Sequence, residues 1–499
     1  MEGKADFLQL NPRDTVAVAL RGIARGETVQ VGGCTLKTAE AIPFGHKMAL
    51  RDVATGEPVI KYGFPIGHTT RDVAAGSWVH THNLQTNLSG TLHYTYVPRH
   101  TLLSPPQGIP DTFDGYVRAD GSVGIRNEVW IIPTVGCVSH TARILQERGN
   151  ARFGGLCDGI FAFPHTAGCS QLGDDLETAQ KILAGLVRHP NAGGVLVLGL
   201  GCENNNFDAF RPYLGQFDPN RVRFLGAQTC DDEIEDGLSL LGELAAYAGK
   251  QRRQTVPASR LTIGLKCGGS DAFSGITANP LCGRICDTVT SLGGRAMLTE
   301  VPEMFGAETI LMERAKDRPT FEKIVNLING FKQYYIGYGQ PIYENPAPGN
   351  KEGGITTLEE KSLGCVQKGG RAIVTDTLSF GEPCRAPGLS LLAGPGNDGV
   401  SITNLASSGA QMILFTTGRG NPLGTAVPTV KLASNRALAA RKPNWIDFDA
   451  GGLADGLSFD EAHASLWQYL LGVASGRIHT KNEINGYREI AVFKNGVTL

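Results

Sequence analysis

Two histidines stand two residues apart in the stretch SWVHTHNLQTN (77–87). If this segment is a β-strand, His80 and His82 point to the same face, because side chains alternate along a strand. Two neighbouring imidazoles can bind a metal ion or hydrogen-bond a polyhydroxy substrate, with Asn83 and Asn87 beside them. Either use needs partners from elsewhere in the chain. A pair of exposed histidines on an edge strand is the alternative interpretation.

Cysteines follow several apolar runs that end in glycine or in a polar turn. They are Cys137 in EVWIIPTVGCV, Cys169 in HTAGCSQ, Cys202 in GGVLVLGLGCENN and Cys267 in LTIGLKCGGSD. Thiolates are soft ligands suited to iron or zinc, and imidazole joins them readily. We predict that Cys169, Cys202 and Cys267 converge on one metal ion together with His80 and His82. Buried structural cysteines are the alternative.

Other polar residues follow the same apolar runs. In an open parallel sheet, ligands bind beyond the carboxyl ends of the strands, so these residues are site candidates. The predicted catalytic residues are His165, Glu203 and Lys266, and the predicted substrate-binding residues are His80, His82, Asn83, Asn204, Ser270, Asp271 and Arg419. His165 is the candidate general base, with a hydrogen-bonded core histidine as the alternative. Arg419 in TGRGNP can hold a carboxylate, with a surface arginine as the alternative.

The elements that must position these residues follow two different sequence patterns, one in the first part of the chain and one in the rest. Residues 1–97 read as short β segments bounded by Gly, Pro or Asp, and residues 98–113 are a proline-rich linker. From residue 114 buried-strand runs alternate with helical patterns such as GDDLETAQKILAGLVRH. This alternation predicts an α/β fold with a mostly parallel sheet. We divide it into a second domain at 114–255 and a C-terminal domain at 256–499.

Composition excludes several classes of protein. The formal net charge of −2 and the pI of about 6.6 argue against a nucleic-acid or membrane-surface protein. The start MEGKADFLQL has no signal-peptide pattern, and no apolar run predicts a membrane span. The 11 cysteines are scattered, so we expect reduced thiols and a cytoplasmic protein. GLGCENN is only a partial dinucleotide fingerprint, since position 204 is asparagine.

Taken together, several long motifs resemble the altronate/galactarate dehydratase family. They are GHKMALRDVATGEPVIKYGFPIG with VHTHN, GIRNEVWIIPTVGCV, GCSQLGDD, VLGLGCENN, CGGSDAFSGITANP, TEVPEMFGAE and PGNKEGGITTLEEKSLG. The resemblance covers nearly the whole chain, from about residue 14 to the C-terminal VFKNGVTL. It implies an N-terminal β-clip domain of the SAF type, a linker, and a two-part α/β region whose last part is Rossmann-like.

The resemblance also implies an activity: dehydration of a sugar acid, stimulated by Fe²⁺, with Mn²⁺ or Zn²⁺ as alternative metals. D-altronate would lose water across C2 and C3, and the partners would be the small-molecule substrate and a second copy in a homodimer. Two departures affect substrate identity, because Lys266 replaces a more usual acidic residue and Ser139 a more usual asparagine. Galactarate dehydration or sulfite elimination on the same scaffold is the nearest alternative. A nicotinamide-dependent dehydrogenase and a catalytically inactive sugar-acid sensor are the others.

Overall fold

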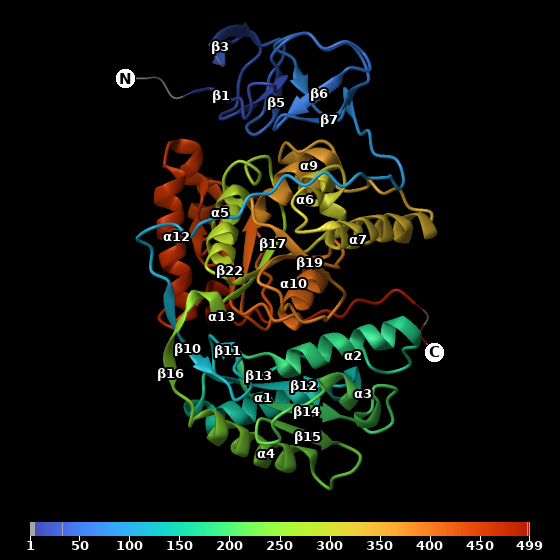
Figure 1. Cartoon of the computed structure of the whole chain (residues 1–499), viewed down its shortest axis with the longest axis vertical. Coiled ribbons are helices and arrows are strands. Elements are labelled where there is room, and N and C mark those ends of the chain that lie inside the picture. Colours follow the sequence, from blue (N-terminus) through green and yellow to red (C-terminus); the bar gives the residue numbers. More distant parts are fainter. Residues whose placement is uncertain (1–4, 32, 497, 499) are drawn as a thin grey trace.

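The computed structural model describes residues 5–31, 33–496 and 498. Figure 1 shows a small β lobe at one end, an α/β lobe at the other, and a larger α/β lobe between them. The middle lobe is built by the C-terminal half of the chain. The predicted architecture, a small N-terminal β domain followed by an α/β region with mostly parallel sheets, is confirmed.

The N-terminal lobe consists of short antiparallel strands. Its main sheet has the order β1-β2-β5-β8, beside the pair β3-β4 and the sheet β6-β7-β9. The strands are β1 (Phe7–Leu8), β2 (Val16–Ala19), β3 (Thr28–Val31), β4 (Cys34–Lys37), β5 (Lys47–Ala49), β6 (Pro58–Lys61), β7 (Phe64–Thr69), β8 (Trp78–Val79) and β9 (Leu84–Gln85). Apolar side chains alternate into its small core, as in β3, where Val29 and Val31 are buried and Thr28 and Gln30 are exposed.

Residues 86–111 contain no helix or strand and cross the face of the middle lobe as a strap (Figure 1). Tyr94, Tyr96 and Ile109 pack against the core of that lobe. Tyr94 also donates a 2.5 Å hydrogen bond to Glu308, which pairs with the buried Lys332 at 2.9 Å. The strap is therefore fixed to the body by both apolar and polar contacts.

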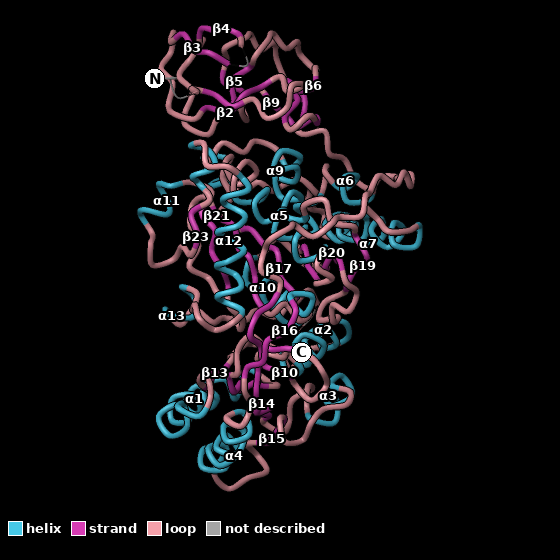
Figure 2. Tube along the Cα trace, turned by 60° about the vertical axis from the view of Figure 1, so that its left-hand side comes forward, coloured by secondary structure: helices cyan, strands magenta, loops and turns pink. Residues whose placement is uncertain are grey.

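The second lobe is built on a parallel sheet of order β13-β12-β14-β15. Helices α1 and α4 cover one face, and α2 and α3 cover the other (Figure 2). The elements are β12 (Glu128–Pro133), α1 (Ser139–Phe153), β13 (Ile160–Ala162), α2 (Gly173–Arg188), β14 (Ala192–Gly199), α3 (Phe207–Leu214), β15 (Val222–Gly226) and α4 (Glu233–Ala248). Because α2 shares an apolar core with α10 (Asp398–Ser407), the second and middle lobes are joined through buried surface.

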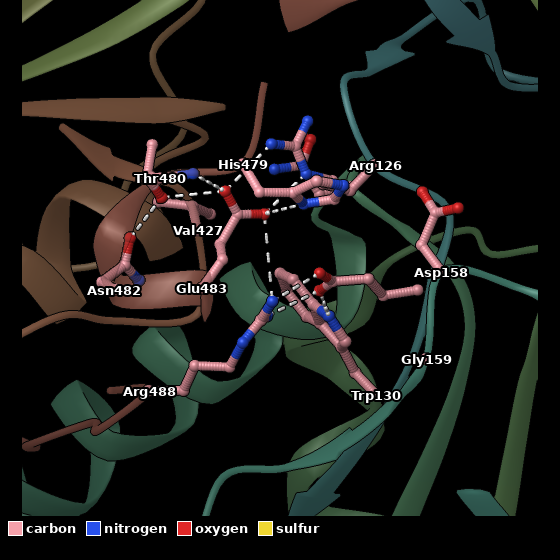
Figure 3. A network of polar contacts seen from close by, with 12 residues as sticks. Arg126, Trp130, Asp158, Gly159, Val427, His479, Thr480, Asn482, Glu483 and Arg488 are labelled. Carbon is pink, nitrogen blue, oxygen red and sulfur yellow. Dashed lines mark hydrogen bonds and ion pairs between the residues drawn. The ribbon is translucent and has the colours of Figure 1, made fainter. Parts of the chain in front are cut away.

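A second junction between these lobes is polar. It lies beside the antiparallel sheet of β10 (Thr112–Val117), β11 (Val123–Gly124) and β16 (Arg253–Pro257). Figure 3 shows Glu483 of the C-terminal segment between Arg126 and Arg488, and Arg488 also binds Glu128 in the second lobe. Burial opposes ionisation of Glu483, but His479 and Arg126 together hold its pKa well below the ordinary range. The Arg126–Glu483 and Arg488–Glu128 pairs are almost fully buried, so loss of one partner would leave an uncompensated buried charge.

The middle lobe holds a seven-stranded parallel sheet of order β19-β20-β18-β17-β21-β22-β23. Its strands are β17 (Thr262–Cys267), β18 (Arg295–Leu298), β19 (Val374–Leu378), β20 (Gly388–Leu392), β21 (Met412–Thr417), β22 (Thr429–Ala433) and β23 (Phe448–Asp449). Its helices, besides α10, are α5 (Ala278–Ser291), α6 (Glu308–Met312), α7 (Arg318–Gly337), α8 (Pro348–Glu352), α9 (Leu358–Cys365), α11 (Arg436–Arg441), α12 (Phe459–Ala474) and α13 (Lys481–Asn485). Strand order reverses between β17 and β21, and such a switch point is where open parallel sheets place their ligands.

Two smaller findings concern the sequence predictions. The strand predicted through His80 and His82 was wrong, because β8 ends at Val79 and residues 81–83 form a turn. In the described part of the chain, no helix has the length and apolar character needed to cross a membrane.

Candidate active site

The switch point of the middle sheet brings two loops into contact. The carbonyl of Gly269, after β17, accepts hydrogen bonds from the amides of Gly418 and Arg419, after β21, at 3.0 and 2.9 Å. A Cβ at Gly418 would lie 2.2 Å from Cγ of Asp271, so only glycine permits this approach. Four donors from Ser274, Ser434 and Asn435 bind the Asp271 carboxylate and fix the loop.

Two thiols and a carboxylate meet beneath this crevice. Cys267 ends β17, Glu303 lies in the short 3₁₀ turn Val301–Met304, and Cys365 ends α9. A Glu303 carboxylate oxygen lies 3.0 Å from the Cys267 sulfur and accepts a hydrogen bond from Cys365 at 3.2 Å, and the two sulfurs are 3.5 Å apart. All three residues are buried. Among the described residues, this is the one group of three such side chains whose ligand atoms all lie within 4.8 Å.

Lysines neutralise this buried group. Lys368 donates to the Cys267 sulfur at 2.8 Å, and Lys361 pairs with Glu303 at 2.8 Å. The hydrogen bond from Cys365 lowers the pKa of Cys267 to about 6, and the nearby ammonium groups favour the same ionisation against the cost of burial. Cys267 is therefore the thiolate of the pair and Cys365 the thiol.

A strained residue lies at the same place. Glu300 has a left-handed backbone with φ of 68°, which costs a non-glycine residue about 1–3 kcal/mol. Its carboxylate accepts from the Cys267 amide at 3.0 Å and forms a short ion pair with Lys266. Lys266 also binds Asp398 at 2.7 Å. The strain is held by these contacts, which fix the end of β17 where Cys267 stands.

The N-terminal lobe of strands β1–β9, called the SAF-type lobe from here on after the domain that the resemblance implies, docks onto this region through buried lysines. Lys47 of β5 and Lys61 of β6 bind the two oxygens of Glu360 at 2.9 and 2.7 Å, and all three side chains are at most 1% exposed. Thr357 caps α9 as its spacing from Glu360 predicts, since its hydroxyl accepts from the Glu360 amide. The Glu360 carboxylate itself forms the ion pairs with Lys47 and Lys61. One helix, α9, thus carries both the docking carboxylate and Cys365.

His80 belongs to this interface, whereas His82 does not enter it. Nδ1 of His80 lies 2.9 Å from the hydroxyl of Thr356, and burial, with Lys47 nearby, lowers its pKa to about 3. His80 is therefore neutral at pH 7. His82 is exposed and packs on Trp78. The Asn83 side chain binds the amide of His80 and the carbonyl of Trp78, so it shapes the turn.

The space at this interface is small. A cavity of about 10 Å³ is bounded by residues of both lobes, among them Lys61, Ser270, Lys361 and Cys365. The Ser270 hydroxyl is buried and has no hydrogen-bond partner among the described residues. A larger cavity of about 480 Å³ opens between the same two lobes beside Arg21, Ser434 and Asn435. The last two bind Asp271 and so connect this cavity to the switch-point loop.

The remaining predicted residues lie in the second lobe, on a different sheet. They are His165, Cys169, Cys202, Glu203 and Asn204, which follow β13 and β14. Cys169 and Cys202 are exposed, whereas Cys267 is buried in the middle lobe between Cys365 and Glu303. The structure therefore does not gather the three predicted cysteines at one ion.

The side-chain polar atoms of His165 and Glu203 are hydrogen-bonded to nearby loop and strand-end groups. Nε2 of His165 lies 2.7 Å from the Pro133 carbonyl, and Nδ1 accepts from the Ala167 amide. Burial lowers its pKa. The Glu203 carboxylate accepts from Thr134 and from the amides of Leu200 and Gly201. Both side chains hold loops in place.

Arg419 was predicted as a site residue, whereas several other residues near the site were not predicted from the sequence. The Arg419 guanidinium is about half exposed and pairs with Glu352 at 3.0 Å. The sequence interpretation did not select Cys365, Lys361, Lys368 or Glu360, because they lie in a helical segment rather than after a strand. The signal that could have found them was the unusual density of charge and cysteine in EEKSLGCVQK (359–368).

Three family models match the chain. They describe the altronate/galactarate dehydratase SAF domain (residues 5–87), the D-galactarate dehydratase/altronate hydrolase second domain (115–249) and the D-galactarate/altronate dehydratase C-terminal domain (258–498). The chain is 51% identical over 498 residues to altronate dehydratase of Escherichia coli K12, covering 99% of this chain and 100% of that protein. It is 49% identical over 500 residues to altronate dehydratase of Bacillus subtilis 168, covering 99% of each. Galactarate dehydratase (L-threo-forming) of E. coli K12 is 32% identical over 512 residues, covering 98% of this chain and 97% of that protein.

The SAF-type lobe, the parallel sheet with its buried site and these full-length matches define an enzyme of the hydro-lyase class. The chain belongs to the altronate/galactarate dehydratase family.

Proposed function

We propose that this enzyme removes water from D-altronate across C2 and C3, giving 2-keto-3-deoxy-D-gluconate. The observation that carries the proposal is the 51% identity to an altronate dehydratase along the full length of both chains. The geometry agrees, because buried lysines, a thiolate and carboxylates meet at the switch point of a parallel sheet.

The reaction poses a specific electrostatic problem. The C2 proton is weakly acidic, because its removal places a second negative charge beside the substrate carboxylate. Catalysis therefore needs positive charge at the carboxylate, a base at C2 and stabilisation of the departing 3-hydroxyl. Cys267, Cys365 and Glu303 are donors suited to Fe²⁺, our preferred metal, or to Mn²⁺ or Zn²⁺. When bound there, the ion would supply positive charge to substrate oxygens.

The chain supplies further groups for binding. Lys61 and Lys361 line the small cavity, and their ammonium groups can pair with a carboxylate. The unpartnered Ser270 hydroxyl can bond a sugar hydroxyl in the same place. A cavity of about 10 Å³ holds no sugar acid, since small-molecule sites are usually about 300–1,000 Å³. We infer that the SAF-type lobe shifts on the middle lobe when substrate enters this cavity.

We assign removal of the C2 proton to His80 rather than to His165. His80 reaches the interface from the SAF-type lobe and is neutral at pH 7, the form that accepts a proton. An anionic substrate nearby would raise its pKa toward a more effective value. In His165 both ring nitrogens already serve backbone groups.

A pair of histidine variants separates these roles. His80→Gln should lower kcat by about 10²–10⁴-fold, the usual contribution of a general base, with a smaller fall in Tm than His165→Gln, because the His80 ring makes one hydrogen bond and the His165 ring two. His165→Gln should instead lower Tm, because it disturbs buried hydrogen bonds, and should keep most turnover per folded molecule. Steady-state kinetics and thermal unfolding of both variants provide the comparison. Wild-type kcat in His80→Gln would remove it as the base.

Substrate identity is tested by direct assay. The protein should be incubated anaerobically with Fe²⁺ and thiol and offered D-altronate or galactarate separately, and the 2-keto-3-deoxy acid should be quantified. We expect kcat/KM for altronate to exceed that for galactarate by at least about 10³-fold, because sites built to bond hydroxyls reject mismatched ones strongly. Turnover of galactarate alone would assign the sister reaction, and Lys266 and Ser139 would then be the first residues to exchange.

A further inference from the structure

The loops beyond the second sheet carry an unusual set of cysteines. The order of the sheet is β13-β12-β14-β15, and one cysteine follows each of these strands at its carboxyl end: Cys169, Cys137, Cys202 and Cys230. Carboxyl ends of parallel strands share one edge, and neighbouring strands are about 4.8 Å apart. The thiols of Cys137, Cys169 and Cys202 are exposed at this edge.

Hydrogen bonds tie the three exposed cysteines into one structure. The amide of Gly136, next to Cys137, donates to Ala167 at 3.0 Å. The amide of Asn205 donates to Gly168, next to Cys169, at 3.1 Å. The amide of Ser170 donates to the Asn204 side chain at 2.9 Å. The loops of Cys137, Cys169 and Cys202 are therefore held against one another.

The backbone of these loops is tightly constrained. Ser170, which follows Cys169, has a left-handed φ of 56°, and strain of this kind concentrates at functional sites. A Cβ at Gly168 would lie 2.0 Å from the Thr134 carbonyl, so this loop lies directly on the end of β12. Beneath it, the buried side chains of His165 and Glu203 bind only loop and strand-end groups. Both are positioning residues for the cysteine-bearing loops.

We propose that Cys137, Cys169 and Cys202 bind an iron–sulfur cluster at the edge of the second sheet. This centre is separate from the Cys267 group in the middle lobe. The spacing of the thiols favours a cluster over a single ion. A tetrahedral zinc ion with Zn–S bonds of about 2.3 Å needs sulfurs about 3.8 Å apart. No three of the four strand-end thiols in the described chain lie within 4.8 Å of one another. A cluster holds its cysteine ligands further apart because several iron and sulfide atoms lie between them.

Cys230 is not a ligand in this assignment. It is half-buried, and its thiol lies 3.7 Å from the carbonyl of Ala227 in its own turn. Three protein thiolates leave one iron of a four-iron cluster open to another ligand. This arrangement also gives a matched control inside the same lobe.

The test uses the full-length protein purified anaerobically from iron-replete cells. After iron bound at other sites is subtracted, we expect equal amounts of iron and acid-labile sulfide. We also expect broad visible absorption that bleaches on reduction by dithionite. Cys137→Ser, Cys169→Ser and Cys202→Ser should each lose the sulfide and the absorption while Tm changes little, because these thiols are exposed. Cys230→Ser, and Cys34→Ser in the SAF-type lobe, should keep both.

Four results would overturn the proposal. Wild-type protein without labile sulfide has no cluster, and zinc that depends on the same three cysteines without sulfide would make the centre mononuclear. Equal loss of sulfide in Cys230→Ser would refute the three-ligand assignment. Unchanged sulfide in the triple variant Cys137→Ser/Cys169→Ser/Cys202→Ser would place the cluster elsewhere. Because sulfide is measured directly, none of these outcomes depends on whether altronate is the substrate.

Discussion

Cys267→Ser is expected to lower kcat for D-altronate on the order of 10³-fold while the protein remains folded. Cys267 is the thiolate of the buried Cys267–Glu303–Cys365 group, and serine is a poor ligand for a soft metal. Loss of the positive charge that a bound ion provides costs several kcal/mol of transition-state stabilisation, and each 1.36 kcal/mol is tenfold in rate. Two quantities should be measured. One is kcat under anaerobic conditions with Fe²⁺, and the other is the iron content of the protein after subtraction of the iron that acid-labile sulfide accounts for.

The matched control is Cys282→Ser. Cys282 lies on α5 and is a fully buried free thiol, but it is outside the group of three ligand atoms. It therefore reports the cost of placing a hydroxyl at a buried cysteine without removing one of the three ligand atoms. Wild-type iron content and turnover in Cys267→Ser would reduce Cys267 and its neighbours to a structural network of thiols and lysines.

Glu360→Gln is expected to detach the SAF-type lobe and abolish most turnover. The substitution keeps the shape of the side chain but leaves Lys47 and Lys61 buried without their shared countercharge. Removing one partner of a buried ion pair typically costs about 3–5 kcal/mol. Limited proteolysis in the strap at 86–111 and the Tm of the SAF-type lobe measure the detachment. Activity should fall in parallel, because the SAF-type lobe carries His80, which we propose as the base, and holds it beside Thr356 of the middle lobe.

The control is Glu57→Gln, in which an exposed ion pair with Arg51 in the same lobe is lost. Such a pair contributes about 0–1 kcal/mol, so docking and turnover should stay near wild type. Protease resistance and full activity in Glu360→Gln would show that apolar contacts alone hold the lobe.

The same carboxylate predicts a pH dependence of docking. Burial raises the pKa of Glu360, but Lys47 and Lys61 outweigh it and lower the pKa to about 2. A carboxyl group with a depressed folded pKa stabilises the folded state above its ordinary value of 4.5, and this contribution is lost as pH falls toward 2. Docking should therefore be constant near neutrality and weaken progressively below about pH 4.5.

Much of the fold could be predicted from local patterns. Short strands bounded by turn residues indicated the N-terminal lobe, and buried runs alternating with helical periods indicated parallel sheets, because both follow from periodicities of 2 and 3.6. The turn at His80 was missed because a two-residue alternation looks the same in a strand and in a strand followed by a turn. The limits of the domains given from sequence, 1–97, 114–255 and 256–499, stay predictions.

The sequence by itself determined the family, the α/β architecture and a set of polar residues beyond strand ends, because these depend on short motifs and on local periodicity. Only the tertiary structure decided which of those residues share a site. It divided the predicted cysteines between two sheets, placing Cys267 with Glu303 and Cys365 and leaving Cys169 and Cys202 in the other lobe. It also brought Lys47 and Lys61 to Glu360, about 300 residues away along the chain. Such proximity arises from strand order and lobe docking, and neither is encoded in the spacing of residues along the sequence.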